Sequence, residues 1–182
     1  MRICPNCRSQ FDNQPGNSCT VCGWSLELCE GIPVYLSNAD REDRSFSDYV
    51  TNYKELSEAD LQQEIVDKTY LNNQAEKLVS YLDRQNFGSI LEVGVGQGFF
   101  LRKLREHYAN STVTAVDISI PFLKHVKTLE NVECIVANAE NLPFREEYDL
   151  VVASDILEHV INPIDFLLSV NFSLRLDGVM VL

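Results

Sequence analysis

The sequence predicts an α/β fold, namely a doubly wound parallel β-sheet that follows a small cysteine-rich module. From about residue 74 onward, short apolar segments alternate with helical segments, which is typical of a parallel sheet with helices on both faces. Before residue 36 the chain is rich in Cys, Gly, Pro and Asn and has little helical periodicity. A length of 182 residues suits one domain of ordinary size with an appended module.

Three regions are therefore expected along the chain. Residues 1–36 form a metal-binding module, residues 37–73 a linker with a leading helix, and residues 74–182 the α/β domain. Near the second boundary the chain changes from a polar stretch to segments whose apolar residues recur at regular spacing, which supports a division there.

The middle region is polar but carries Phe46, Tyr49 and Tyr53, which indicates that it packs against another part of the protein. Tyr53 is a candidate for covering a bound cofactor, although a packing role is favoured. Ser57 and Asp60 have the spacing of a helix capping box, so a helix is expected to begin at Ser57.

The expected strands of the α/β domain are short and apolar, as in strands buried on both faces of a sheet. They cover residues 89–93, 112–116, 132–136, 148–153 and 179–182. The expected helices place apolar residues at helical spacing and cover residues 74–83, 99–108, 121–129 and 163–176. Pro121 suits a helix start and Gly178 a helix end.

Charge and hydropathy disfavour two classes of partner. A net charge of −12 with scattered Lys and Arg works against a phosphate backbone, although a structured RNA stays open as a partner. No apolar run approaches the roughly 18–20 residues that span a bilayer, so no membrane partner is expected. The N-terminus lacks the apolar core of a secretion signal. We expect a cytoplasmic protein, and the sequence leaves its oligomeric state open.

The segment between the first expected strand of the α/β domain and the next helix is a glycine-rich turn. Gly94, Gly96 and Gly98 let the backbone bend sharply and admit a ligand closely. A dinucleotide-binding fingerprint would have glycine where Phe99 stands. The acidic Glu92 before the glycines suits a ligand with a positive charge, such as the ammonium of an amino acid.

A second carboxylate, Asp117, follows the next expected strand, about 20 residues beyond the glycines. A carboxylate in that place can accept two hydrogen bonds from ribose hydroxyls. Taken alone, Asp117 is equally compatible with a helix cap or a turn residue. Its spacing from the glycine turn favours the ribose.

These motifs together resemble the class I S-adenosylmethionine-dependent methyltransferases over residues 75–182. The matching segments are Glu92–Gly98, Asp117, and residues 138–144, 148–154, 157–160 and 175–178. The resemblance implies S-adenosylmethionine as cofactor and a Rossmann-like sheet with strand order 3-2-1-4-5. The family fold continues with two further strands, and residues 74–182 reach only the fifth. We therefore expect this domain to be incomplete at its C-terminus, either as a fragment or with the missing part supplied from elsewhere.

The resemblance also implies roles for further residues. Ile118 would accompany Asp117 at the ribose, and Asn138 and Ala139 would meet the adenine. Asn138 stands where the family most often has Asp, so its amide oxygen would make a weakened or altered adenine contact. Ser154, at the end of the fourth expected strand, would lie near the methyl group.

Two Cys-x-x-Cys pairs lie 11 residues apart near the N-terminus. Cys4, Cys7, Cys19 and Cys22 supply four thiolates, which suits a closed, structural, tetrahedral zinc site. Unrelated cysteines or a redox pair are the alternatives. The module loosely resembles the N-terminal modules of some bacterial methyltransferases, including the ribosomal-RNA guanine methyltransferases.

The function implied by the resemblance is methyl transfer to a small-molecule acceptor. A ribosomal or transfer RNA acceptor is the second interpretation, and a non-catalytic, partner-binding relative of methyltransferases is the third. Phe99 and Glu92 disfavour an oxidoreductase that uses a nicotinamide cofactor. No catalytic residue is assigned, because His159 is more readily read as orienting backbone than as a general base.

Overall fold

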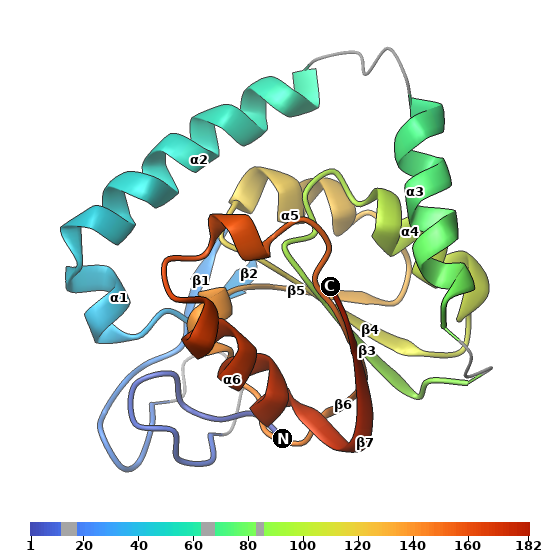
Figure 1. Cartoon of the computed structure of the whole chain (residues 1–182). Helices are drawn as coiled ribbons and strands as arrows, with labels where there is room; N and C mark the ends of the chain where they lie inside the picture. Colours follow the sequence, from blue (N-terminus) through green and yellow to red (C-terminus); the bar gives the residue numbers. More distant parts are fainter. Residues whose placement is uncertain (12–17, 63–67, 83–85) are drawn as a thin grey trace.

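The computed structural model describes residues 1–11, 18–62, 68–82 and 86–182. Over these residues the centre of the fold is a seven-stranded sheet in the order β1-β2-β5-β4-β3-β6-β7 (Figure 1). The strands are β1 (Glu27–Cys29), β2 (Ile32–Val34), β3 (Ser89–Val93), β4 (Thr112–Asp117), β5 (Val132–Val136), β6 (Tyr148–Val152) and β7 (Leu174–Val181). Every neighbouring pair is parallel except β1 and β2.

The five strands of the α/β domain have the predicted order. Counted from β3, the arrangement β5-β4-β3-β6-β7 is 3-2-1-4-5. The complete sheet differs in detail, because the hairpin of β1 and β2 extends it beyond β5. Val34 of β2 pairs with Val136 of β5, and the Tyr35 N–H donates to the Val136 carbonyl at 2.7 Å.

The described helices flank this sheet (Figure 1). They are α1 (Asn38–Glu42), α2 (Arg44–Gln62), α3 (Lys68–Ser80), α4 (Phe99–His107), α5 (Ile120–Val126) and α6 (Pro163–Ser173), with short 3₁₀ helices η1 (Ala139–Asn141) and η2 (Leu157–His159). The helix expected over 74–83 thus begins earlier, and its expected last residue, Asp83, lies outside the described residues.

The prediction that a helix begins at Ser57 is wrong. Ser57 lies inside α2, where it is buried and its hydroxyl donates to the Lys54 carbonyl at 2.8 Å. The Ser119 hydroxyl donates to Ser57 at 2.7 Å. The helix is instead capped by Asp43, whose Oδ1 accepts from the Phe46 N–H at 3.2 Å. The helix therefore begins after the cap at Asp43, 14 residues before Ser57, and the capping motif at Ser57 is not used.

The expected boundary between the last helix and the last strand is also wrong. The helix ends at Ser173 and β7 begins at Leu174, so Gly178 lies in a strand instead of ending a helix. Leu174 pairs with Tyr148 and Val179 with Leu150, a register shift within the strand. Sheet pairing outweighs local helix propensity in this segment.

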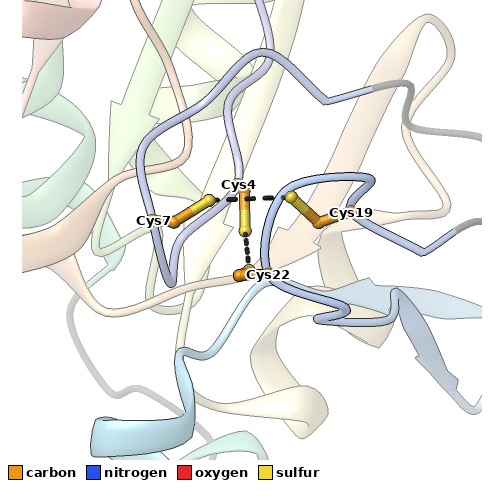
Figure 2. Close-up of side chains that lie close together, drawn as sticks. All are labelled: Cys4, Cys7, Cys19 and Cys22. Atoms are coloured by element: carbon orange, nitrogen blue, oxygen red, sulfur yellow. Dashed lines mark hydrogen bonds between the residues drawn. The ribbon is translucent and has the colours of Figure 1, made fainter.

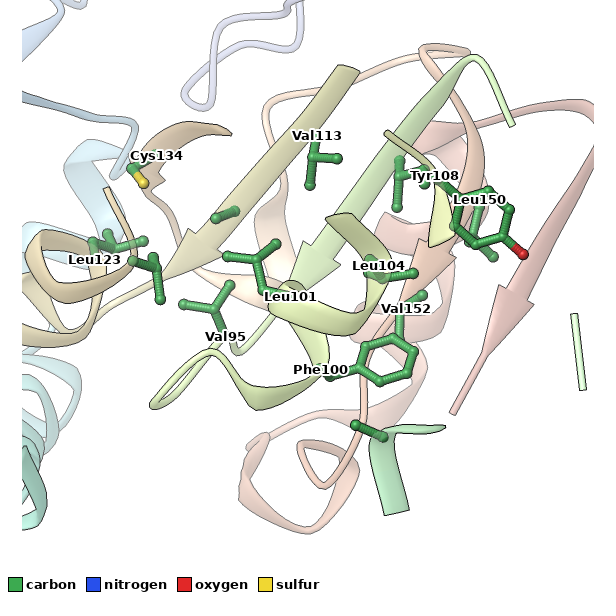
Figure 3. Close-up of a cluster of buried hydrophobic side chains, with 14 of the residues drawn as sticks. Val95, Phe100, Leu101, Leu104, Tyr108, Val113, Leu123, Cys134, Leu150 and Val152 are labelled. Carbon is green, nitrogen blue, oxygen red and sulfur yellow. The ribbon is translucent and has the colours of Figure 1, made fainter. Parts of the chain in front are cut away.

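Strand residues alternate between two hydrophobic clusters on opposite faces of the sheet, as the two-residue period of a strand requires. Ile90, Val113 and Leu150 face the cluster made with α3, α4 and α5 (Figure 3). Leu91 and Val151 face the other cluster, made with α6 and the cysteine-rich region. Both faces are covered, as predicted for a doubly wound sheet.

Each helix in the described part of the chain is too short or too polar to cross a membrane.

Candidate functional site

A cleft opens at the carboxyl ends of β3, β4 and β5, the edge at which open α/β sheets bind ligands. The loop after β6 and one face of α2 complete its walls. Its empty space is about 670 Å³ including the open mouth, a size that suits a small organic ligand. Five of the residues expected to bind the cofactor line it, namely Gly94, Asp117, Ile118, Asn138 and Ala139. Glu92, Gly96, Gly98 and Ser154 lie outside the lining.

The glycine turn has the backbone conformation that its sequence predicts. Gly94, Gly96 and Gly98 have φ angles of 76°, 49° and 74°, in the left-handed region that only glycine adopts freely. A Cβ on Gly98 would lie 2.5 Å from Cγ1 of Val126, and a Cβ on Gly94 2.9 Å from Cδ1 of Ile156. The turn therefore packs closely on α5 and on the loop after β6.

Two buried carboxylates lie behind and beside this turn. Oδ2 of Asp117 accepts a hydrogen bond from the Gly96 N–H at 3.2 Å, and Oδ1 accepts one from the Ser119 N–H at 2.8 Å. Burial nonetheless raises the pKa of Asp117 to about 6. Burial, and then the charge of Asp117, raises the pKa of Glu92 well above its usual range.

Glu92 also has an unfilled acceptor. Its Oε2 is buried and has no hydrogen-bond partner among the described residues, and such groups are costly to leave unpaired. The carboxylates of Glu92 and Asp117 together favour a ligand that brings hydrogen-bond donors and positive charge. An S-adenosylmethionine molecule has both, in its ribose hydroxyls, its ammonium and its sulfonium.

Asn138 is held at the cleft wall by both ends of its side chain. Its Oδ1 accepts from the Glu140 N–H at 3.0 Å and so caps η1. Its Nδ2 donates to Oδ1 of Asp40 in α1 at 2.8 Å. The amide oxygen keeps one further lone pair for a ligand. The contact with Asp40 joins α1 to the cleft, which the sequence did not indicate.

The aromatic residues of α2 line the same cleft. Phe46, Tyr49 and Tyr53 lie on one face of the helix, and the Tyr49 and Tyr53 rings stack with centroids 5.8 Å apart. Tyr53 and Phe122 also form a T-shaped pair with ring centroids 6.0 Å apart. Their spacing at i, i+3 and i+7 is the signal in the sequence that marks one helix face. Their presence in a polar stretch predicts only that these residues pack; they line the cleft, and Tyr53 packs against Phe122.

The loop after β6 places other polar groups near the cleft. His159 lies in η2 and lines the cleft, together with Asp155. The Ser154 hydroxyl donates to Oδ2 of Asp155 at 3.1 Å. Oε1 of Glu140 accepts from the Ile161 N–H at 2.6 Å, which ties this loop to η1.

The four cysteines of the two pairs form one cluster, from two loops that face each other (Figure 2). Their sulfurs all lie within 4.8 Å of one another, with Cys4 and Cys22 at 3.6 Å and Cys7 and Cys19 at 3.6 Å. Four sulfurs around a zinc ion at roughly 2.3 Å lie about 3.8 Å apart in a tetrahedron. The arrangement fits a tetrahedral metal ion, and it is too open for disulfides.

The two loops have the same backbone form. Each pair is followed by a left-handed residue, Arg8 with φ of 63° and Gly23 with φ of 77°. The N–H of each donates to the carbonyl of the first cysteine, Arg8 to Cys4 at 2.9 Å and Gly23 to Cys19 at 2.8 Å. Hydrogen bonds with Ser9 lower the pKa of Cys19 to about 6 and also lower the pKa of Cys7, whereas burial raises the pKa of Cys4 to about 12.

The comparisons with known sequences agree with this geometry. A profile of the family described as methyltransferase domain matches residues 91–182. The tRNA U34 carboxymethyltransferase of Pseudoalteromonas translucida is 31% identical over 113 residues, which are 59% of this chain and 35% of that protein. The malonyl-[acyl-carrier protein] O-methyltransferase 2 of Ilyobacter polytropus is 31% identical over 93 residues, which are 48% of this chain and 36% of that protein. The chain thus spans about a third of the length of these relatives.

The fold is shared with solved structures. The N-methyltransferase NodS from Bradyrhizobium japonicum, in complex with S-adenosyl-L-homocysteine, superposes with a TM-score of 0.59 and 17% sequence identity. The superposition covers 71% of this chain and 71% of that one.

Proposed function

Because the chain belongs to the methyltransferase-domain family, of the class I S-adenosylmethionine-dependent type, we propose that it binds S-adenosylmethionine in the cleft and methylates a small-molecule acceptor. The observation that carries the proposal is the pair of buried carboxylates, Glu92 and Asp117, at the glycine turn. Their chemistry matches the donors and the positive charge of the cofactor.

Each part of the cofactor has a proposed partner. Asp117, with Ile118 beside it, binds the ribose hydroxyls, and Glu92 binds the methionine ammonium directly or through a water molecule. Gly94, Gly96 and Gly98 admit the methionine and ribose portions. Asn138 and Ala139 contact the adenine. Ser154 lies near the methyl group.

When bound, the sulfonium supplies an activated methyl group. The residues of the chain then act mainly by positioning, which supplies a large part of the rate in bimolecular transfers. The stacked Tyr49 and Tyr53 exclude water from the cleft and orient the acceptor toward the methyl group of the bound cofactor. No side chain needs to form a covalent bond, and we assign no general base.

A small acceptor is favoured over RNA by charge. The net charge of −12 repels a phosphate backbone, and the cleft is lined by aromatic and apolar side chains beside its carboxylates. Transfer RNA is the second candidate, because one tRNA U34 carboxymethyltransferase matches the chain at 31% identity. One malonyl-[acyl-carrier protein] O-methyltransferase matches at the same identity, so identity alone favours neither kind of acceptor.

We further propose that Cys4, Cys7, Cys19 and Cys22 bind one structural Zn²⁺. The distances between their sulfurs support it, and four thiolates leave no open position for catalysis. Reduced thiols of this kind belong to a reducing compartment, so we place the protein in the cytoplasm.

The proposed activity is tested with S-adenosylmethionine labelled on the methyl group. The zinc-loaded chain is incubated with the cofactor and either a pool of small metabolites or bulk tRNA, with Asp117→Ala as the inactive control. We expect label in the small-molecule fraction with the wild type alone. Label in tRNA instead would support the second candidate, and no transfer to either pool would contradict an active enzyme.

A further inference from the structure

The first cysteine loop is hydrogen-bonded to residues 141 and 142, which directly follow the cleft-lining residues 138–140. Nη1 of Arg8 donates to Oδ1 of Asn141 at 2.6 Å and to the Leu142 carbonyl at 3.0 Å. In return, Nδ2 of Asn141 donates to the Pro5 carbonyl at 3.0 Å. These three hydrogen bonds connect a loop defined by two cysteines to the loop that follows β5, more than 130 residues away in sequence.

A second connection runs through α1. Oδ1 of Asn6, in the same cysteine loop, accepts from the Asn38 N–H at the start of α1 at 2.9 Å. Two residues later, Asp40 closes a capping box with Ser37 through its Oδ2. Its Oδ1 accepts from Nδ2 of Asn138 in the cleft wall at 2.8 Å. The position of α1 therefore depends on the loop and sets the position of Asn138.

The cysteine loop and the cleft wall also share one hydrophobic cluster. Cys4 and Cys19 pack in it together with Val93, Ala137 and Leu142, and Val93 and Ala137 also line the cleft. The cysteines are free thiols, so no covalent bond closes the loops. In so short a segment a bound metal supplies most of the folding free energy.

From these contacts we propose that zinc and cofactor bind cooperatively, because the metal-closed loop, through Arg8, holds in place residues 141–142, which directly follow the cleft-lining residues 138–140. The proposal rests on the proposed cofactor and zinc sites. A wall ordered in advance spares the cofactor the entropic cost of ordering it. By thermodynamic linkage, the cofactor must raise zinc affinity by the factor by which zinc raises cofactor affinity.

Arg8 is the positioning residue to test, because it contacts the wall without lining the cleft. Arg8→Met removes the donors and keeps the length of the side chain. Arg145→Met is the matched control, since it makes the same change of charge at an exposed position near Arg8. Arg8→Lys returns a donor and should restore part of the effect.

Two titrations are made on each zinc-loaded protein. Calorimetry gives the Kd of S-adenosylhomocysteine, and competition with a chelator gives zinc affinity with and without saturating S-adenosylhomocysteine. We expect Arg8→Met to weaken S-adenosylhomocysteine about tenfold, within the usual range of coupling between sites, and to leave zinc affinity without ligand unchanged. In the wild type, S-adenosylhomocysteine should raise zinc affinity about tenfold, and in Arg8→Met it should not.

If Arg8→Met behaves like Arg145→Met in both titrations, the proposed coupling is overturned while the proposed function stands. A folded, zinc-loaded wild type that does not bind S-adenosylhomocysteine would instead overturn the proposed function and the coupling with it. The titration of S-adenosylhomocysteine is made on zinc-loaded proteins, so its comparison of Arg8→Met with Arg145→Met stands even if the metal-free wild type unfolds.

Discussion

The carboxylate of Asp117 is anchored on the backbone of Gly96, whose N–H lies 3.2 Å from Oδ2. The acid at the end of β4 is thereby fixed against the turn that follows β3. The contact explains why a buried acid can keep a defined orientation before any ligand arrives. Because Asp117 lines the cleft, its ionisation state is expected to affect the binding of a ligand there.

Cofactor binding is predicted to weaken in mild acid. Burial raises the pKa of Asp117 to about 6, and only the ionised carboxylate accepts two ribose hydrogen bonds. Below that pH the affinity for S-adenosylhomocysteine should fall by up to about tenfold per pH unit. Calorimetry between pH 5 and about pH 8 measures it, with Asp117→Asn expected to bind weakly and without this dependence. A Kd of the wild type that stays constant across the range contradicts the assignment.

Glu92 is predicted to bind cofactor at the expense of stability. Its pKa in the folded chain is raised, mainly by burial, so the stability associated with its protonated form is lost as the pH rises from about 4.3 through the folded pKa. Glu92→Gln removes this loss. Its Tm should exceed that of the wild type increasingly as pH rises, while its affinity for S-adenosylhomocysteine falls. If the Tm of Glu92→Gln and the Tm of the wild type change in parallel with pH, Glu92 is not the group whose titration lowers stability.

Two glycines of the turn are predicted to differ in their tolerance of alanine. Gly96→Ala places a Cβ in open space and should cost about 1–2 kcal/mol for its left-handed backbone. Gly98→Ala adds a clash with Val126, where the Cβ would lie at 2.5 Å, and should cost about 1–3 kcal/mol more. Urea unfolding measures both variants. Shortening Val126 to Ala in the Gly98→Ala background should recover part of the extra cost, and no recovery would count against the packing explanation.

One zinc ion per chain is predicted by the four sulfurs. Cys22→Ser should abolish stoichiometric zinc, as measured by elemental analysis, and lower the Tm, because the closed site holds the module together. Cys29→Ser changes a cysteine outside the cluster and should keep the metal. Equal zinc content in both variants would exclude this cluster as the site.

The sheet was largely predictable because its strands are buried on both faces. A strand such as β6 (Tyr148–Val152) is apolar apart from Asp149, and Asp117 follows the glycine turn at about the spacing typical of a ribose-binding acid. The sequence could not reveal that β2 joins the sheet beside β5, because the pairing of Val34 with Val136 depends on contacts 102 residues apart. Edge pairing of this kind leaves no local periodicity.

The misplaced boundaries have a similar cause. Ser57 and Asp60 match a capping box, but burial of Ser57 against Ser119 places them inside a helix. The end of the last helix is set by pairing of Leu174 with Tyr148. Local propensity is outweighed in both places by tertiary contact.

The candidate site was predicted in part. Asp117 and Gly94 line the cleft, and the spacing of the motifs is what placed them together. Contacts of the N-terminal region with the segment after β5 could not be foreseen, because the hydrogen bonds of Arg8 and Asp40 follow no sequence pattern.

Calorimetric titration of S-adenosylhomocysteine into the zinc-loaded chain tests cofactor binding most directly, with NAD as the rival ligand. We expect one molecule of S-adenosylhomocysteine to bind per chain, Asp117→Ala to abolish the binding, and NAD not to bind. A folded, zinc-loaded chain that binds NAD, or that binds S-adenosylhomocysteine equally well after Asp117→Ala, would contradict the proposed cofactor site.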